Sequence, residues 1–397
     1  MTAPDTSVSV HGTVTPGFEP VFTAFEAAVS TDTESGAALC IRQHGKAVVD
    51  LWGGVADSRT GREWTADTPS VIFSCTKGVM SILLARLVQE GRLDYEAPVV
   101  DYWPEYGAAG KGRTRVKDAI SHRAGLSAPR ADWTRGDILD WHRATALLAA
   151  QAPLWEPGEG WSYHAITHGW LTGELVRRVT GMMPGDHLAE LATRPLGVDA
   201  WIGVPSDRQG EVAHMVVGPT LDALNARQAK QARLVDVDWP MRAMTLGGAL
   251  PNELVGDDDG FNRADVRAAQ IPGAGGVASA RALATIWSSV VAETDGVRLL
   301  DDDTIGLATR EQTSGAPYFA VPGPWPRWAM GFQLDSEARR YLGPGSFGHD
   351  GAGGQVAFAD RDHRIGFAFL TNRMEADDPR ATGIVTALRD VVIRQGI

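Results

Sequence analysis

The sequence has few cysteines and no long apolar run. Its 397 residues include two cysteines, Cys40 and Cys75, too few for a disulfide framework or a cysteine-based zinc site. No stretch reaches the roughly 18 apolar residues that a membrane helix needs. Residues 1–10 lack a basic start followed by an apolar segment, so we expect no secretory signal. These absences predict a cytoplasmic protein with reduced thiols and no membrane partner.

Positive charge is also scarce. Lysine and arginine number 37 against 49 aspartates and glutamates, which gives a net charge of −12 at pH 7. The basic residues are scattered among acidic ones, whereas nucleic-acid binding requires a basic stripe. We therefore expect no nucleic-acid partner. The hydrophobic fraction of 44% is typical of a globular protein, and the length allows two domains.

Strand-like segments lie near both ends of the chain. Two apolar segments flank His44-Gly45-Lys46 and predict a hairpin that ends at Gly53-Gly54. Short strands return after about residue 325, at 328–332, 355–359 and 365–370. The acidic runs 257–260 and 301–303 predict surface turns.

Helical spacing of apolar residues recurs at 18–29, 74–90 and 381–394. The middle of the chain, from about 115 to 265, is mostly helix-like. We therefore predict an α+β fold in which residues 1–115 and 266–397 form an antiparallel sheet flanked by helices. Residues 116–265 would form a second, mostly helical domain.

The clearest helix begins with Ser-x-x-Lys, as Ser74 and Lys77. Positions i and i+3 share one helix face, so the two side chains could form a hydrogen bond. A serine hydroxyl becomes nucleophilic when a base takes its proton, and burial near a helix N-terminus could lower the pKa of the lysine enough. The same spacing also fits an ordinary serine N-cap followed by a solvated lysine, so it does not decide the function alone.

Three downstream motifs favour the catalytic interpretation. They are Ser-His-x-x-Gly-Leu at 121–126, Pro-Gly followed by Tyr163 at 157–163, and His349-Asp350-Gly351 before a strand. In this order they resemble the motifs of the class C β-lactamases and penicillin-binding proteins. The resemblance is closest to the family VIII carboxylesterases, which are serine esterases with the β-lactamase/transpeptidase fold. It extends over about residues 20–395.

The resemblance implies a division of catalytic roles. Ser74 would attack the ester carbonyl and carry the acyl group. Lys77 would accept or hold the proton, and Tyr163 would share that work and protonate the leaving alcohol. Two coupled groups titrate as a pair, so the sequence leaves open which of them is the general base.

The resemblance also implies an oxyanion hole and a substrate-binding segment. The backbone N–H groups of Ser74 and Ala352 would bind the oxyanion. Gly351 would allow a close backbone approach, and His349 would contact the substrate.

Two departures from the β-lactamase pattern narrow the expected substrate. Tyr163 is followed by His164-Ala165, whereas the class C enzymes have Ala-Asn. His349 replaces a lysine that the family associates with the carboxylate of the antibiotic, and a histidine is mostly neutral at pH 7. Both changes disfavour penicillin hydrolysis and suit an uncharged ester. The resemblance further implies short acyl chains.

Several alternatives remain. The signature Gly-x-Ser-x-Gly is absent, which disfavours an α/β-hydrolase. His164 and His168 have the i, i+4 spacing of zinc ligands, but Ala165 stands where a zincin has glutamate. We therefore expect no metal and no organic cofactor. An amidase or peptidase, a β-lactamase or an acyltransferase of the same fold stays possible, and so does a non-catalytic binding protein, although intact Ser74, Lys77 and Tyr163 disfavour it.

Aromatic residues are abundant around these motifs. The chain has 13 tryptophans, among them Trp161 beside Tyr163, and Trp325 and Trp328 before the third motif. They fit an apolar ester pocket. Ordinary core packing explains any single tryptophan at least as well.

Overall fold

A computed structural model describes residues 8–30, 32–232 and 236–396. Its main sheet has nine strands in the order β1-β3-β2-β15-β14-β13-β12-β11, with β4 paired to β3. All of these pairings are antiparallel. The strands are β1 (Val10–Val14), β2 (Gly36–Gln43), β3 (Lys46–Asp57), β4 (Arg62–Glu63), β11 (Arg327–Trp328), β12 (Gln333–Leu334), β13 (Ser346–Asp350), β14 (Val356–Asp360) and β15 (Ile365–Thr371). Both ends of the chain thus build one sheet, as predicted.

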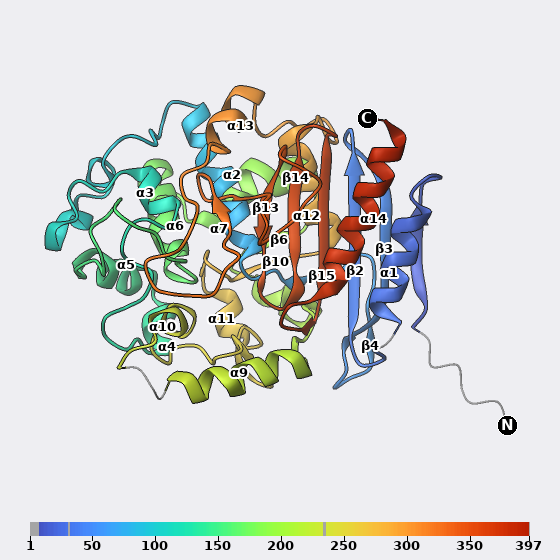
Figure 1. The fold of residues 1–397 in the computed structure, drawn as a ribbon, viewed down its shortest axis with the longest axis horizontal. Helices are drawn as coiled ribbons and strands as arrows, with labels where there is room; N and C mark the ends of the chain where they lie inside the picture. Colours follow the sequence, from blue (N-terminus) through green and yellow to red (C-terminus); the bar gives the residue numbers. More distant parts are fainter. Residues whose placement is uncertain (1–7, 31, 233–235, 397) are drawn as a thin grey trace.

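Helices cover both faces of this sheet. On one face α1 (Glu19–Val29) lies beside α14 (Pro379–Gln395) (Figure 1). On the other face lie α12 (Ala280–Val291) and α2 (Cys75–Gln89). Successive side chains of a strand point to opposite faces of the sheet. Leu39 of β2 therefore packs with α1 and α14, whereas the next residue, Cys40, belongs to the core on the other face.

Helix bounds agree closely with the predictions, but two strand predictions are wrong. The hairpin turns at His44 and Gly45, which have φ of 51° and 79°, as expected. However, β3 continues past Gly53-Gly54, because it still has β4 as a partner. The single strand predicted at 328–332 is two short strands, β11 and β12, separated by a turn at Gly331 with φ of 81°.

The acidic runs are also only partly turns. Asp258 is exposed at the turn between β8 (Val255–Gly256) and β9 (Asp259–Gly260). Asp301 accepts a hydrogen bond from the Thr304 N–H and starts α13 (Asp302–Ala308). Aspartate is a favoured N-cap because its carboxylate satisfies a free first-turn N–H group.

The middle of the chain is mostly helical. It contains α3 (Val116–Ile120), α4 (Arg135–Leu139), α5 (Trp141–Ala150), α6 (Thr167–Thr180), α7 (Pro184–Leu188), α8 (Arg194–Leu196), α9 (Pro219–Ala232), α10 (Trp239–Thr245) and α11 (Ala264–Ala268). Single turns of 3₁₀ or π helix are η1 (Val99–Asp101), η2 (Pro104–Gly110), η3 (Ala189–Thr193), η4 (Ser206–Glu211) and η5 (Ala352–Gly354).

Two small sheets join the middle segment to the rest. One has three strands, β5 (Ser70–Val71), β10 (Gly276–Ala278) and β6 (Ala200–Ile202). In the other, β7 (Val216–Val217) pairs with β16 (Arg373–Met374). One apolar core includes Trp287 of α12 and Trp170 of α6. The division at 115/116 and 265/266 stays a prediction.

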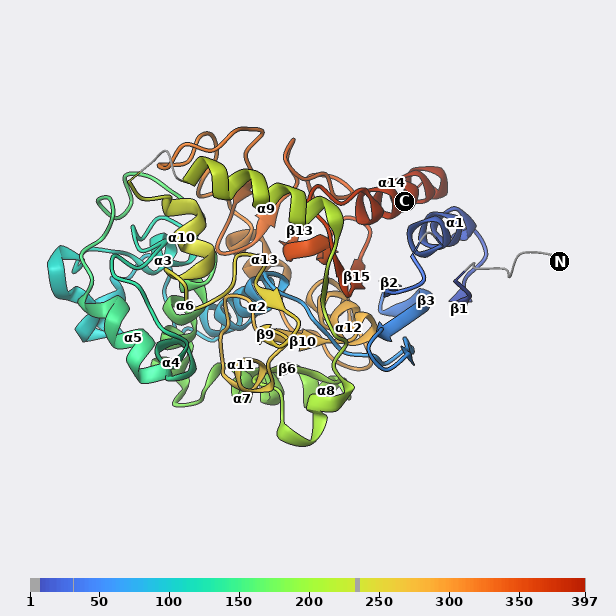
Figure 2. The same ribbon diagram turned by 90° about the horizontal axis from the view of Figure 1, so that it is seen from below.

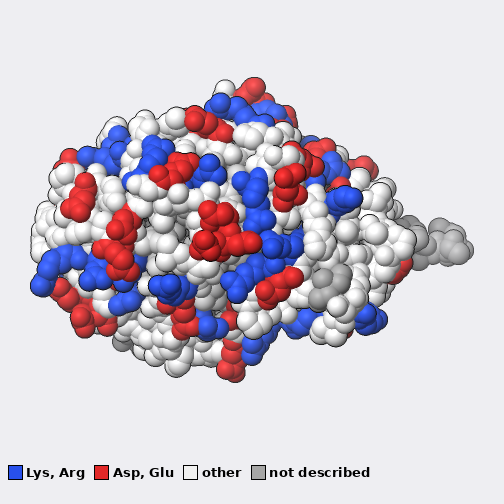
Figure 3. Space-filling model, turned by 90° about the horizontal axis from the view of Figure 1, so that it is seen from above, with Lys and Arg blue, Asp and Glu red and all other residues white. Residues whose placement is uncertain are grey.

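Within the described residues, no helix is long and apolar enough to cross a membrane. On the face seen in Figure 3, several basic side chains adjoin one another near the middle, and acidic side chains lie among and beside them.

Candidate active site

The small three-stranded sheet fixes the start of α2. The Ile72 N–H donates to the Gly276 carbonyl of β10 at 2.9 Å. In return, the Gly276 N–H donates to Thr76 Oγ1 of α2 at 2.9 Å. A Cβ on Gly276 would lie 2.5 Å from Thr76 Oγ1, so only glycine allows this approach. Ser74, between Ile72 and Thr76, is the N-cap residue of α2.

The residue before Ser74 has a strained backbone. Phe73 has φ of 43°, in the left-handed region that non-glycine residues rarely adopt. Its ring is fully buried and packs edge-to-face on Phe261, with ring centroids 5.8 Å apart. Such strain persists only where packing over-determines it, and it concentrates at functional sites.

Lys77 is fully buried and has three polar neighbours. Its Nζ lies 2.9 Å from Ser74 Oγ and 2.6 Å from each of the carbonyl oxygens of Ala165 and Gly273. Burial lowers the pKa of Lys77 well below its ordinary value of 10.5. Burial therefore favours the neutral amine of Lys77 over the ammonium form.

This geometry determines how a neutral Lys77 is oriented. A carbonyl oxygen can only accept a hydrogen bond. In the neutral form, the two N–H bonds would point to Ala165 and Gly273, and the lone pair would point to the Ser74 hydroxyl. In that form Lys77 is placed to accept the proton of Ser74.

Close backbone packing supplies one of these carbonyls. Helix α6 meets the segment before β10 so closely that a Cβ on Gly169 would lie 1.9 Å from the Gly273 nitrogen. The glycines at 273, 275 and 276 are the sequence signal for such a close approach. The acceptors are main-chain atoms, which leave no side-chain motif.

Tyr163 lies over Lys77 on the other side. Lys77 Nζ is 4.9 Å from the centre of the phenol ring. The ring stacks on Trp328 at 5.4 Å and lies 4.9 Å from the His122 ring. Burial raises the pKa of Tyr163, although a polar contact with Ser74 acts in the opposite direction. Tyr163 is therefore a neutral phenol beside Lys77.

Buried histidines surround this tyrosine. His164 Nδ1 lies 2.7 Å from the Ser162 carbonyl, and its Nε2 accepts from the Leu126 N–H at 3.2 Å. His168 Nε2 donates to the Ile120 carbonyl at 3.0 Å. Burial lowers the pKa of both histidines, to about 3 for His164. Their rings therefore pack against the backbone, and no cluster of three or more metal-ligating side chains occurs among the described residues.

The third motif lies beside the start of α2. His349, on β13, is 2% exposed, and its Nδ1 donates to the Asp350 carbonyl at 2.6 Å. A Cβ on Gly351 would lie 2.4 Å from the Ile72 carbonyl, so glycine lets η5 approach the residues before Ser74. Ala352 is the first residue of η5. The structure thus brings all six site residues predicted from the sequence to one region.

Both cysteines are buried and unpaired. Cys75 Sγ donates to the His349 carbonyl at 3.1 Å, which joins α2 to β13. Burial raises the pKa of the Cys75 thiol well above its ordinary value and that of Cys40 to about 12. Neither thiol has the thiolate character of a nucleophile.

A cavity of about 720 Å³ opens onto this region, and Tyr163 and His349 line it. Its size lies within the usual range for small-molecule sites. Much of its wall is apolar and comes from α9, α10 and the segment before β11, for example Met241, Met244 and Trp325.

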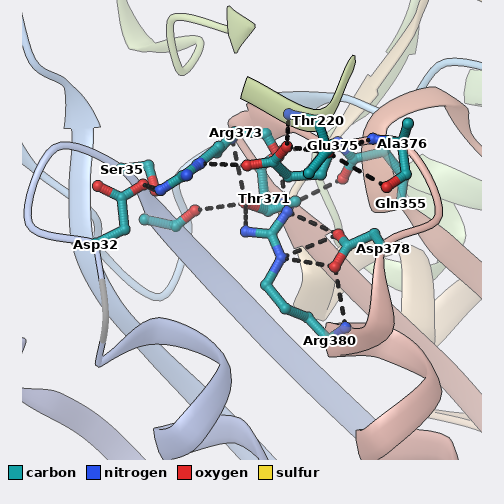
Figure 4. Close-up of polar contacts among 11 residues, drawn as sticks. Asp32, Ser35, Thr220, Gln355, Thr371, Arg373, Glu375, Ala376, Asp378 and Arg380 are labelled. Atoms are coloured by element: carbon teal, nitrogen blue, oxygen red, sulfur yellow. Dashed lines mark hydrogen bonds and ion pairs between the residues drawn. The ribbon is translucent and has the colours of Figure 1, made fainter. Parts of the chain in front are cut away.

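Helix α9 forms one wall of this cavity and is anchored at its N-terminal end. Figure 2 shows α9 running from the side of α10 towards α14. Glu375 accepts from the Thr220 N–H at 3.0 Å and from Arg373 at 2.7 Å. Arg373 also pairs with Asp32 of the α1–β2 loop at 2.6 Å (Figure 4). The Glu375 N–H donates to the Gly353 carbonyl of η5 at 3.3 Å, so one network contacts both η5 and the cavity wall.

The fold is that of a known class of proteins. A model of the Beta-lactamase family matches residues 23–389. The chain therefore belongs to the beta-lactamase family.

Within this family, similar proteins carry esterase names. The esterase/beta-lactamase LipL of Mycobacterium tuberculosis is 34% identical over 378 residues, which cover 94% of this chain and 85% of that protein. A solved family VIII carboxylesterase is 33% identical with a TM-score of 0.84, covering 96% of this chain and all of that chain (100%). EstA from Arthrobacter nitroguajacolicus Rue61a is 30% identical with the same TM-score of 0.84, covering 97% and 99%.

Proposed function

We propose that the protein is a serine carboxylesterase that cleaves carboxylic esters, with a preference for short acyl chains, through an acyl-enzyme on Ser74. The observation that carries this proposal is the arrangement of Lys77, whose Nζ lies 2.9 Å from Ser74 Oγ and 2.6 Å from each of two backbone carbonyl oxygens. The ester class is supported by the esterase relatives at 34% and 33% identity.

In acylation, Lys77 takes the hydroxyl proton of Ser74 as Oγ attacks the ester carbonyl carbon. The carbonyl oxygen gains the negative charge, and the backbone N–H groups of Ser74 and Ala352 bind it. The pKa of Lys77, lowered by burial, keeps the amine free to accept this proton.

Tyr163 then completes the proton transfer. The tetrahedral intermediate collapses, the bond to the alcohol oxygen breaks, and the phenol gives its proton to that oxygen. Lys77 returns its proton to Tyr163, which its position 4.9 Å from the ring supports. Since the pKa of Tyr163 is raised, the phenol acts as the acid and Lys77 as the base.

In deacylation, water replaces the alcohol and the steps reverse. Water attacks the acyl carbon, and its proton passes by way of Tyr163 to Lys77. Lys77 then gives a proton to Ser74 Oγ as the bond from Oγ to the acyl carbon breaks. The products are the carboxylic acid and the free enzyme.

Two features count against β-lactam hydrolysis as the main activity. A neutral His349 occupies the place of the lysine that the family associates with a carboxylate. The His164 side chain is fully buried and bonded to the backbone, so it cannot replace the missing asparagine amide. Amide hydrolysis and acyl transfer to another alcohol share the same nucleophile and stay alternatives.

Two other sequence predictions stay proposals. The two buried free thiols support a cytoplasmic location with reduced cysteines. The mostly helical segment 116–265 supports a lobe distinct from the sheet.

The test compares wild type with Ser74→Ala on p-nitrophenyl acetate, a chromogenic cephalosporin and a fluorophosphonate probe. We expect ester turnover, slow or no cephalosporin turnover, and probe labelling, all lost in Ser74→Ala. Absence of ester turnover and labelling in wild type would refute the hydrolase, and full activity of Ser74→Ala would refute the nucleophile. Faster turnover of the cephalosporin than of the ester would reverse the substrate assignment.

A further inference from the structure

The cavity beside Ser74 combines aromatic faces with acidic side chains. We infer that it selects esters that carry a protonated amine over neutral esters, and neutral esters over esters that carry a carboxylate. This inference rests on the proposed function, because it names the substrate class of the same site.

The charged side chains that line the cavity have one sign. They are Asp238 and Asp350, and no lysine or arginine lines it within the described part of the chain. Asp350 is still 32% exposed on its side chain. Asp238 caps α10 by accepting from the Met241 N–H at 2.9 Å. A carboxylate in the substrate would therefore meet two acidic side chains and no lysine or arginine on the described lining.

The nearby basic groups offset these charges only in part. Arg339 pairs with Asp350 at 2.9 Å and neutralises part of its charge, but Arg339 does not itself line the cavity. Lys77 is buried, and its Nζ is hydrogen-bonded to the Ala165 and Gly273 carbonyls and to Ser74. His349 keeps one ring nitrogen on the Asp350 carbonyl, and burial lowers its pKa to about 3. It is neutral wherever the protein is folded near neutral pH.

Aromatic rings supply an attraction for cations. Trp161, Tyr163, Phe319, Trp325 and Trp328 all line the cavity. A cation over such ring faces is attracted by their quadrupole, and the attraction grows when the site excludes water. A lining of acidic and aromatic groups attracts ammonium groups. An aliphatic lining would not favour a cationic substrate over an anionic one.

The test uses rigid esters that differ only in one charge. One series consists of acetates of phenols with a para ethyl, aminomethyl or carboxymethyl group, and the other of methyl benzoates with the same substituents. We expect kcat/KM to fall from ammonium to ethyl to carboxylate in at least one series. The two ends should differ by about tenfold or more, and the ratio should shrink as salt screens the charges.

Charge-removing variants identify the source of the preference. Asp238→Asn keeps an N-cap residue but removes the charge, and Asp350→Asn removes the other. Each should lower the ratio of ammonium to carboxylate turnover. Asp303→Asn, at an exposed acid away from the cavity, removes the same charge and should leave the ratio unchanged. His349→Lys should favour the carboxylate ester.

Calorimetry compares the affinity of the wild-type protein for benzylammonium with its affinity for phenylacetate. This measurement requires neither turnover nor a variant. Equal affinity, together with equal turnover of the ammonium and carboxylate esters, would overturn the inference while leaving the esterase intact. A change in ratio no larger in Asp238→Asn and Asp350→Asn than in Asp303→Asn would also overturn it. Loss of all ester turnover, with benzylammonium still preferred, would instead refute the proposed function alone.

Discussion

Two fully buried lysines differ in what their neighbours can do. Lys111 Nζ donates to three carbonyls, those of Ala108, Ala149 and Gln151, within 2.9 Å. Lys77 has two carbonyls and the hydroxyl of Ser74. Carbonyls cannot give up a proton, but a hydroxyl can. The arrangement therefore suits Lys111 to a structural role and Lys77 to a chemical one.

This contrast provides a matched pair of substitutions. Lys77→Met should lower kcat for p-nitrophenyl acetate by about 10²- to 10⁴-fold, the usual contribution of a general base. Lys111→Met should retain kcat but lower Tm, because it removes the three hydrogen bonds that Lys111 Nζ donates to backbone carbonyls. Steady-state kinetics and thermal melting measure both. An active Lys77→Met protein would show that another group is the base.

The lowered pKa of Lys77 also sets the pH dependence. Between its folded pKa and 10.5, the unfolded chain binds more protons at this residue than the folded protein does. Its destabilising effect is thus absent above pH 10.5 and grows as pH falls towards the folded pKa. The Tm of Lys77→Met relative to wild type should therefore rise as pH falls. kcat/KM of wild type should decline on the acid side, with a midpoint below the ordinary lysine value of 10.5. A decline centred near 10.5 would contradict a lowered pKa of Lys77.

At the scale of elements, helix positions followed from the sequence better than strand positions. Helix α2 has enough turns to reveal an apolar period, and it starts and ends as predicted. Strands β11 and β12 have two residues each, and tertiary packing sets the turn between them: a Cβ on Gly331 would lie 2.2 Å from Ser81 Oγ. No local pattern encodes such a contact.

The sequence likewise predicted only part of the candidate site. Its side chains could be predicted because their motifs are local. The acceptors of Lys77 could not, because they are backbone carbonyls 88 and 196 residues away. Which of the two groups is the base depends on tertiary packing, which buries Lys77 fully and Tyr163 partly.

The approach of η5 to α2 can be tested through Gly351. A Cβ there would lie 2.4 Å from the Ile72 carbonyl, so Gly351→Ala should push Ala352 away from Ser74. We expect kcat to fall by about tenfold or more, because removing one oxyanion donor costs at least that much. Gly343→Ala, where a Cβ meets nothing within 4 Å, is the control. Unchanged kcat in Gly351→Ala would remove Ala352 from the proposed oxyanion hole.

At the scale of the whole molecule, a polar network ties distant parts of the chain to the site (Figure 4). Arg380 donates to the Arg373 carbonyl at 2.8 Å and pairs with Asp378 at 2.7 Å. Through Glu375 the network reaches α9. The helical wall of the cavity is thus anchored to the sheet side of the molecule.

Weakening this anchor should affect binding more than chemistry. Glu375→Gln removes the charge that pairs with Arg373 and caps α9, a change of about 0.5–2 kcal/mol for a cap. We expect KM for bulky aromatic esters to rise a few-fold, with kcat for the acetate retained, and faster limited proteolysis within α9. Asp222→Asn, exposed in the first turn of α9, is the control. A fall in kcat for the acetate with KM unchanged would contradict an anchoring role.

The burial of both cysteines makes the protein suitable for site-specific labelling. Neither thiol offers a thiolate to a maleimide reagent. A cysteine introduced at Asn252, an exposed residue on the cavity lining, would therefore react alone, without removal of the native thiols. An environment-sensitive dye at that position would change its fluorescence as a ligand enters, so occupancy of the cavity could be followed in real time and separately from turnover.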